Sequence, residues 1–156
     1  MCVIALDIFS KFIVRKNFVM INKILLTFPP LTEGILLKRY KRFLAEVQLD
    51  SGETVTAHCA NTGPMKGVLS IGGRVRLRFA PSPTRKLSWS WEQAQVCTHD
   101  GKGTWVGVNT SLPNKLVRLA IEAGLLADVL GDFSEIRNEV KYGEKGNSRI
   151  DLLISP

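Results

Sequence analysis

Apolar and polar side chains alternate most regularly between residues 43 and 49. Every second position is apolar, which predicts a β-strand with one buried face. The expected buried side consists of Phe43, Ala45, Val47 and Leu49. The segment 50–52 has turn chemistry, because its glycine tolerates positive φ and its aspartate can hydrogen-bond the local backbone. The β-branched run over 53–58 then predicts the return strand of a hairpin.

Similar patterns divide the chain up to residue 108 into five expected strands. They cover residues 34–49, 53–58, 74–79, 87–96 and 104–108, with turn residues between them. The first strand is long, and we expect the basic cluster from Lys38 to Arg42 to bend it. Five strands at short spacing, with turns between them, fit an OB-type barrel, a fold that binds oligonucleotides on its strand 2–3 face. Residues 25–108 are therefore predicted to form a five-stranded OB-type barrel.

The pattern changes after residue 108. Helix-capping residues at 109–111 precede apolar positions at helical spacing, and Gly124 is a natural stop. A second short helix over 125–130 and a hairpin of 136–142 with 148–154 are expected to follow. The remaining stretch, about 48 residues, is small for an independent core. We interpret 109–156 as the start of a second domain, so the fold class is mainly β with an α+β tail.

Residues 1–24 are apolar but interrupted by charges. No run reaches the ~18 uncharged residues of a membrane-spanning helix, and the segment lacks a clear signal-peptide pattern. An amphipathic helix and an extra strand are alternatives. The favoured interpretation is a poorly ordered N-terminal extension outside the barrel, and no membrane partner is expected.

The positive charge is unevenly distributed. The net charge is +7, and residues 101–156 carry as many acidic as basic side chains, so the excess lies before them. This distribution favours a polyanion such as nucleic acid as the partner of the first domain. Two basic clusters, 38–42 and 85–86, and the arginines at 74, 76 and 78 are the candidate contact surface. An ordinary solvated basic surface is the alternative.

Two tryptophans follow the second basic cluster. Trp89 and Trp91 share one face of an expected strand, where they could stack on bases. Burial in the core is the more frequent fate of rings this large. His58, at the end of the second expected strand, is interpreted as a polar residue facing a phosphate.

The chain has three cysteines, and their spacing is not that of a disulfide framework. This favours a reducing compartment, so a cytoplasmic location is expected. A zinc site formed by His58, Cys59, Cys97 and His99 is disfavoured. Neighbouring residues on a strand, such as His58 and Cys59, point to opposite faces and cannot easily bind one ion.

Six segments resemble the sugar fermentation stimulation protein A family. They read RYKRFLAEV (39–47), TAHCANTGPMKG (56–67), RKLSWSWE (85–92), VGVNTSLPNKLV (106–117), EVKYG (139–143) and SRIDLL (148–153). The resemblance runs from about residue 25 to 155 and leaves 1–24 outside. It implies an N-terminal OB-type domain, a C-terminal domain similar to PD-(D/E)xK nucleases, DNA binding and a proposed nuclease activity.

The resemblance maps two acidic positions of that nuclease pattern onto Glu139 and Asp151, as catalytic and metal-binding residues. Family members continue into a strand carrying Glu-x-Lys, and this chain stops at Pro156 before it. We therefore expect an incomplete nuclease site and no tightly bound cofactor, with Mg²⁺ as the metal of a complete member. The truncated domain is also expected to leave a surface for association with a second copy.

The resulting hypothesis is a DNA-binding protein whose affinity comes mainly from cations that contact phosphates. The expected nucleic-acid-binding residues are Arg39, Lys41, Arg42, His58, Arg85, Lys86, Trp89 and Trp91. A metal-dependent DNA or RNA nuclease, completed by another chain or a longer reading frame, is the alternative. A broken gene product without stable function is the third.

Overall fold

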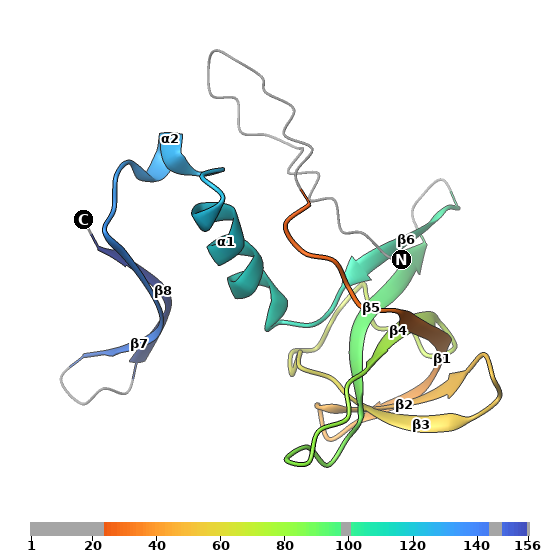
Figure 1. Ribbon diagram of the computed structural model, residues 1–156. Coiled ribbons are helices and arrows are strands. Elements are labelled where there is room, and N and C mark those ends of the chain that lie inside the picture. The colour runs from red at the N-terminus through yellow and green to blue at the C-terminus, as the bar shows by residue number, and fades with distance from the viewer. Residues whose placement is uncertain (1–23, 98–100, 144–147, 156) are drawn as a thin grey trace. The chain divides into compact units, whose positions relative to one another are not determined.

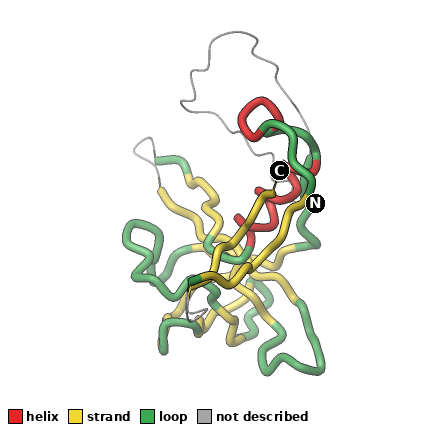
Figure 2. Tube along the Cα trace, turned by 90° about the vertical axis from the view of Figure 1, so that its left-hand side faces the viewer, coloured by secondary structure: helices red, strands yellow, loops and turns green. Residues whose placement is uncertain are grey.

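The computed structural model describes residues 24–97, 101–143 and 148–155. The chain divides into two units, one over Thr27–Thr110 and one that includes Ser111–Pro156, and each is described by itself. The expected extension, 1–24, lies outside the described residues except for its last position. Strands and loops make up most of the described chain (Figure 2).

The first unit is a strongly curved sheet (Figure 1). Its strands are β1 (Leu31–Tyr40), β2 (Leu44–Leu49), β3 (Thr54–His58), β4 (Arg74–Phe79), β5 (Trp89–Cys97) and β6 (Gly103–Gly107). The order is β3-β2-β1-β4-β5-β6. A short parallel pairing of β3 with β5 joins the two ends of the part of this order formed by β1 to β5. Five strands joined in this way confirm the predicted OB-type fold.

The core fills the inside of this curved sheet, and the period-two pattern explains it. Ala45, Val47 and Leu49 are buried as predicted, and β1, β4 and β5 contribute further inward positions. The largest fully buried apolar side chains are Trp91, Leu36, Leu77, Val47 and Val75. Close strand approach also demands a glycine, because a Cβ at Gly34 would lie 2.5 Å from the carbonyl oxygen of Gln48.

The expected first strand, 34–49, is wrong as a single bent strand. The chain reverses over residues 41–43, so that β1 and β2 form an antiparallel hairpin in which Tyr40 faces Leu44. The barrel therefore consists of β1 to β5, and the expected fifth strand is an additional strand, β6, which pairs with β5. Phe43 consequently lies in the turn and is 44% exposed, although the alternation placed it on the buried side.

The second unit contains α1 (Leu112–Glu122), α2 (Ala127–Leu130) and a hairpin of β7 (Glu135–Tyr142) with β8 (Ser148–Ser155). The predicted stop at Gly124 is present, with φ of 73° and its N–H donating to the carbonyl of Ile121. Arg118 of α1 donates to Asn138 of β7 and so ties helix to hairpin. Within the described residues, neither helix has the length and apolar character needed to cross a bilayer.

The three arginines of β4 do not form a free positive stripe. Arg74 donates to both Glu33 and Asp50, and Arg76 also contacts Glu33. Arg76 lies over the ring of Trp105, 3.9 Å from its centroid. These contacts join β4 to β1 and to the turn after β2, so the β4 arginines act in the fold rather than as open phosphate contacts.

This network predicts a specific dependence of stability on pH. Hydrogen bonds from Arg74 lower the pKa of Glu33 and of Asp50 below their ordinary values of 4.5 and 3.8. At Glu33, a further hydrogen bond from Arg76 lowers the pKa in the same direction. Because the folded pKa values are lowered, the stabilisation is present above the ordinary values and is lost as pH falls through the lowered ones.

We therefore expect Arg74→Gln to lower the free energy of unfolding at neutral pH, and the difference from the parent chain to shrink in acid. Urea unfolding at about pH 7 and about pH 3, on either side of the ordinary carboxyl pKa, measures this. Lys66→Gln removes an equal charge at an exposed position and serves as the control. A difference that stays constant between the two pH values would contradict the assignment.

Candidate nucleic-acid interface

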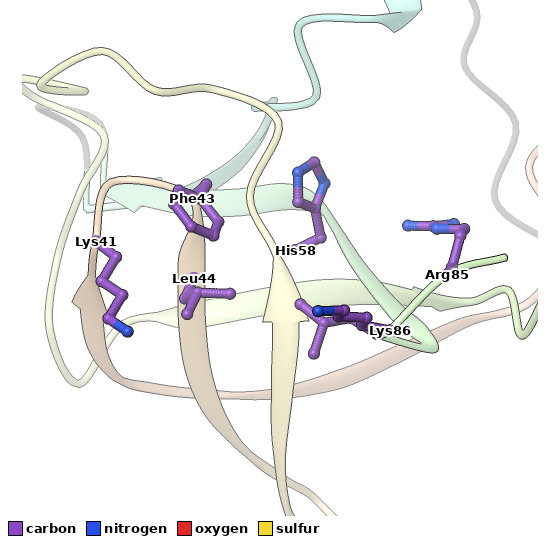
Figure 3. Close-up of a pocket in the computed structure, with 7 residues that line it drawn as sticks. Lys41, Phe43, Leu44, His58, Arg85 and Lys86 are labelled. Atoms are coloured by element: carbon purple, nitrogen blue, oxygen red, sulfur yellow. The ribbon is translucent and has the colours of Figure 1, made fainter.

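A concave pocket of about 460 Å³ opens where β3 meets β5 (Figure 3). We call it the basic pocket, and it is lined by Lys41, Phe43, Leu44, His58, Arg85, Lys86 and Leu87. The lining combines three cationic side chains, one imidazole and three apolar side chains. Such a combination suits a ligand with both anionic and apolar parts.

Three parts of the first unit meet at the basic pocket. The turn between β1 and β2 supplies Lys41 and Phe43, and the facing pair Leu44 and His58 comes from β2 and β3. The loop between β4 and β5 supplies the remaining residues, and at its base the N–H of Ala80 donates a hydrogen bond of 2.7 Å to the carbonyl of Ser88. Strands 2 and 3, with the loops 1–2 and 4–5, are the surface through which OB folds bind oligonucleotides.

The side chains that line the basic pocket give it a positive charge. None of the seven lining residues is a carboxylate. Arg85 is held in place by a hydrogen bond of 2.8 Å from its Nη2 to Oγ of the buried Ser90. A cluster of cations over low-dielectric walls attracts an anion more strongly than the same charges spread over open surface.

Arg39 and Arg42 support the turn instead of lining the basic pocket. Arg39 Nη2 donates to the carbonyls of Arg42, at 2.6 Å, and Asn61, at 2.7 Å. Arg42 Nε donates to the carbonyl of Thr62 at 3.0 Å. These bonds connect the turn after β1 to the loop after β3, so two of the expected phosphate-binding arginines have a structural role.

The turn itself has an unusual backbone. Lys41 and Arg42 have φ values of 49° and 67°, a left-handed conformation that favours glycine and asparagine. Each such residue costs about 1 kcal/mol or more. The arginine bonds offset this cost, and a hydrogen bond of 2.8 Å from Cys59 N–H to the Phe43 carbonyl fixes the end of the turn.

The two tryptophans are not equivalent. Trp91 is 1% exposed and its Nε1 donates to the carbonyl of Gln93, so its expected role as a stacking surface is wrong. Trp89 is half-buried against the core and packs on Phe79, with ring centroids 4.9 Å apart. Neither ring lines the basic pocket.

Sequence reasoning missed the apolar side of the basic pocket. It identified Lys41, His58, Arg85 and Lys86, which the structure brings together, but it did not include Phe43, Leu44 or Leu87. Phe43 was assigned to the core because the alternation of β2 was extended through a turn that lacks glycine. The signal available in the sequence is an aromatic residue that directly follows a basic cluster.

The predicted metal residues lie in the second unit. Glu139 falls between the paired positions Asn138↔Leu152 and Val140↔Ile150, and therefore opposite Asp151 in the β7–β8 hairpin. Glu139 is bound to Arg149 at 2.5 Å. Among the described residues, no group of three or more His, Cys, Asp or Glu side chains could hold a metal ion. The two carboxylates by themselves do not make a complete site.

Cys59, a member of the disfavoured zinc set, is a buried residue of the core. It is fully buried, and its Sγ donates to the carbonyl of Asn61 at 3.2 Å. Burial raises the pKa of its thiol, although the charge of Arg39 acts in the opposite direction. His99, another member of the disfavoured zinc set, lies outside the described residues.

Comparisons with known proteins agree with this architecture. The model of the SfsA N-terminal OB domain matches residues 37–108. A sugar fermentation stimulation protein homolog of Prochlorococcus marinus (strain MIT 9211) is 72% identical over 137 residues, 88% of this chain and 54% of the relative. The chain belongs to the sugar fermentation stimulation protein family. A family member of Synechococcus sp. (strain CC9605) is 67% identical over 132 residues, 85% of this chain and 52% of the relative.

The chain spans about half the length of the curated relatives it matches. Among solved structures, SfsA of Pyrococcus furiosus, described in complex with Ca²⁺, has a TM-score of 0.65 and 26% identity to this chain. The match covers 83% of this chain and 51% of that chain. The matched part of the Pyrococcus furiosus protein therefore has the same fold as the matched part of this chain.

The structural role of Arg39 can be measured. We expect Arg39→Ala to lower the free energy of unfolding by about 1–3 kcal/mol, because two carbonyls lose a charged donor. Urea unfolding of the whole chain measures the loss. Lys86→Ala, which removes an exposed charge from the loop between β4 and β5, should change the stability by no more than about 0.5 kcal/mol. Equal effects of the two variants would contradict the structural role of Arg39.

Proposed function

We propose that the first unit binds nucleic acid at the basic pocket, with DNA as the partner that the family resemblance implies. Lys41, Arg85 and Lys86 contact phosphates, and His58 lies between them on β3. Phosphate contacts of this kind supply affinity and position without reading sequence.

The observation that carries the proposal is the place of these cations. They gather on the strand 2–3 face and the flanking loops, the surface with which OB folds bind oligonucleotides. Most other arginines of the barrel are bound to carboxylates or to backbone carbonyls, as described above. The basic pocket is therefore a place where positive charge of the first unit is clustered and available to a ligand.

The proposal predicts the salt dependence of binding. Lys41→Gly and Lys86→Ala should each weaken DNA binding regardless of sequence, and each should reduce the slope of log K against log salt by about 1. Lys41→Gly should keep or raise the melting temperature, because glycine accepts the positive φ at this position. Weaker binding by a variant that is at least as stable cannot be attributed to unfolding.

Fluorescence anisotropy with a labelled oligonucleotide at several salt concentrations measures the slope. Lys66→Ala, which removes an exposed lysine outside the basic pocket, is the matched control and should leave the slope close to that of the parent chain. Unchanged slopes for both pocket variants would mean that these charges are only solvated surface.

A metal-dependent nuclease is the second candidate function. Two observations favour it: Glu139 lies opposite Asp151 on the hairpin, and the Pyrococcus furiosus relative is described in complex with Ca²⁺. Carboxylates are suitable ligands for Mg²⁺, which polarises a phosphate and lowers the pKa of bound water. The ion pair of Glu139 with Arg149 competes with such a role.

We expect this chain to show little or no DNA cleavage with Mg²⁺ or Mn²⁺, because two carboxylates hold Mg²⁺ only loosely. Incubation of the purified chain with DNA beside Asp151→Asn tests this expectation. Metal-dependent cleavage that disappears in Asp151→Asn would contradict it. If that cleavage also rises steeply with protein concentration, a second copy of the chain completes the site.

A further inference from the structure

The basic pocket has a feature that phosphate binding does not explain. Phosphates require cations and N–H donors, but nearly half of the lining residues are apolar: Phe43, Leu44 and Leu87. Phe43 is 44% exposed, although its carbonyl is hydrogen-bonded to Cys59 and its turn is fixed by two arginines. An aromatic side chain on a rigid support, open to solvent beside three cations, is matched to a ligand with a flat apolar surface next to its charge.

We propose that the basic pocket holds one unpaired nucleobase stacked on Phe43, so that the chain prefers single-stranded to double-stranded DNA. This inference rests on the proposed function and specifies the substrate class of the same site. The ring of Phe43 contacts the face of the base, and Leu44 and Leu87 form the apolar walls. Lys41, Arg85 and Lys86 bind the adjoining phosphates.

The shape of the basic pocket supports an unpaired base. Its volume of about 460 Å³ is in the range of small-molecule sites, which suits a nucleoside. In a duplex the faces of the bases are stacked on each other and the phosphates lie outside. A duplex could therefore satisfy the cations but would leave Phe43 and the leucines against water. A single strand satisfies both sets of residues, because every base has a face available for stacking.

Figure 3 shows the arrangement that this binding mode needs. Phe43 and Leu44 lie on adjacent positions of the β1–β2 turn and β2, and His58 lies beside them on β3. Arg85 and Lys86 approach from the β4–β5 loop on the other side of β3. Cations therefore come from both loops that flank the apolar walls, so a strand that places a base between them has a cation available on each side.

The test compares two single strands with the same phosphates. One is an oligothymidylate of about 12 nucleotides, within the site size of one OB fold, and the other carries abasic sugars in place of its central nucleotides. The whole chain should bind the base-containing strand more tightly than the abasic strand and more tightly than a duplex of equal length. Phe43→Leu should weaken binding to the base-containing strand by roughly 5- to 100-fold. It should leave binding to the abasic strand and the salt slope nearly unchanged.

Phe79→Leu is the matched control. Phe79 is also an exposed phenylalanine of the first unit, at 55%, but it does not line the basic pocket, so its substitution should have little effect on either strand. Phe43→Trp keeps a stacking surface and should restore most of the affinity lost in Phe43→Leu.

The outcomes separate this inference from the function on which it rests. If salt-dependent binding is present but the base-containing strand, the abasic strand and the duplex bind equally, the stacking proposal is wrong and the phosphate interface stands. Equal loss on both strands in Phe43→Leu would assign Phe43 to the shape of the turn and overturn the stacking proposal. If no strand binds with a measurable salt slope, the proposed function itself fails.

Discussion

The candidate site depends on a pairing of only two residue pairs. Ala57↔Trp89 and His58↔Ser90 join β3 to β5 in parallel, at the ends of an otherwise antiparallel order. Without this pairing the β1–β2 turn and the β4–β5 loop would lie at separate places of an open sheet, and the basic pocket would not form. So short a pairing is weak alone and is held by the packing behind it, where Ala57 and Trp91 are buried. The packing of the core therefore supports the pairing on which the site depends.

The positive side chains of the barrel form two groups: some are bound to other groups within the fold, and others line the basic pocket. Arg78 is bound to Glu92, a carboxylate that is 1% exposed and also accepts a hydrogen bond from Asn109. A buried carboxylate needs such partners, because its desolvation would otherwise be costly. Arg39 of β1 and the two remaining arginines of β4, Arg74 and Arg76, likewise act within the fold. The net charge of the chain therefore overstates what a ligand meets, and the local arrangement at the basic pocket matters more than the total.

The sequence predicted the strands of the barrel well where turns contained glycine or aspartate. β4 was predicted at its observed bounds, the end of β2 was predicted at Leu49, and β3 was predicted within one residue. It failed at the β1–β2 turn, because a lysine and an arginine there adopt the conformation usually reserved for glycine or asparagine. The cations of the site could be predicted from composition, but its apolar walls could not. Those walls depend on which residues the β3–β5 pairing brings together, and no local pattern encodes that contact.

This failure of local prediction has a physical meaning. An Asn-Gly turn between β1 and β2 would avoid the backbone cost at Lys41 and Arg42. It would also remove the cation that lines the basic pocket and the arginine that binds the Thr62 carbonyl. The chain therefore departs from the most favourable turn at the position where both support and charge are needed. Departures from local preference are expected at functional sites, where a constraint on side chains outweighs a constraint on backbone. Under the proposed function, the strained turn and the exposed ring of Phe43 that ends it serve one requirement, a rigid platform for a ligand beside the cations.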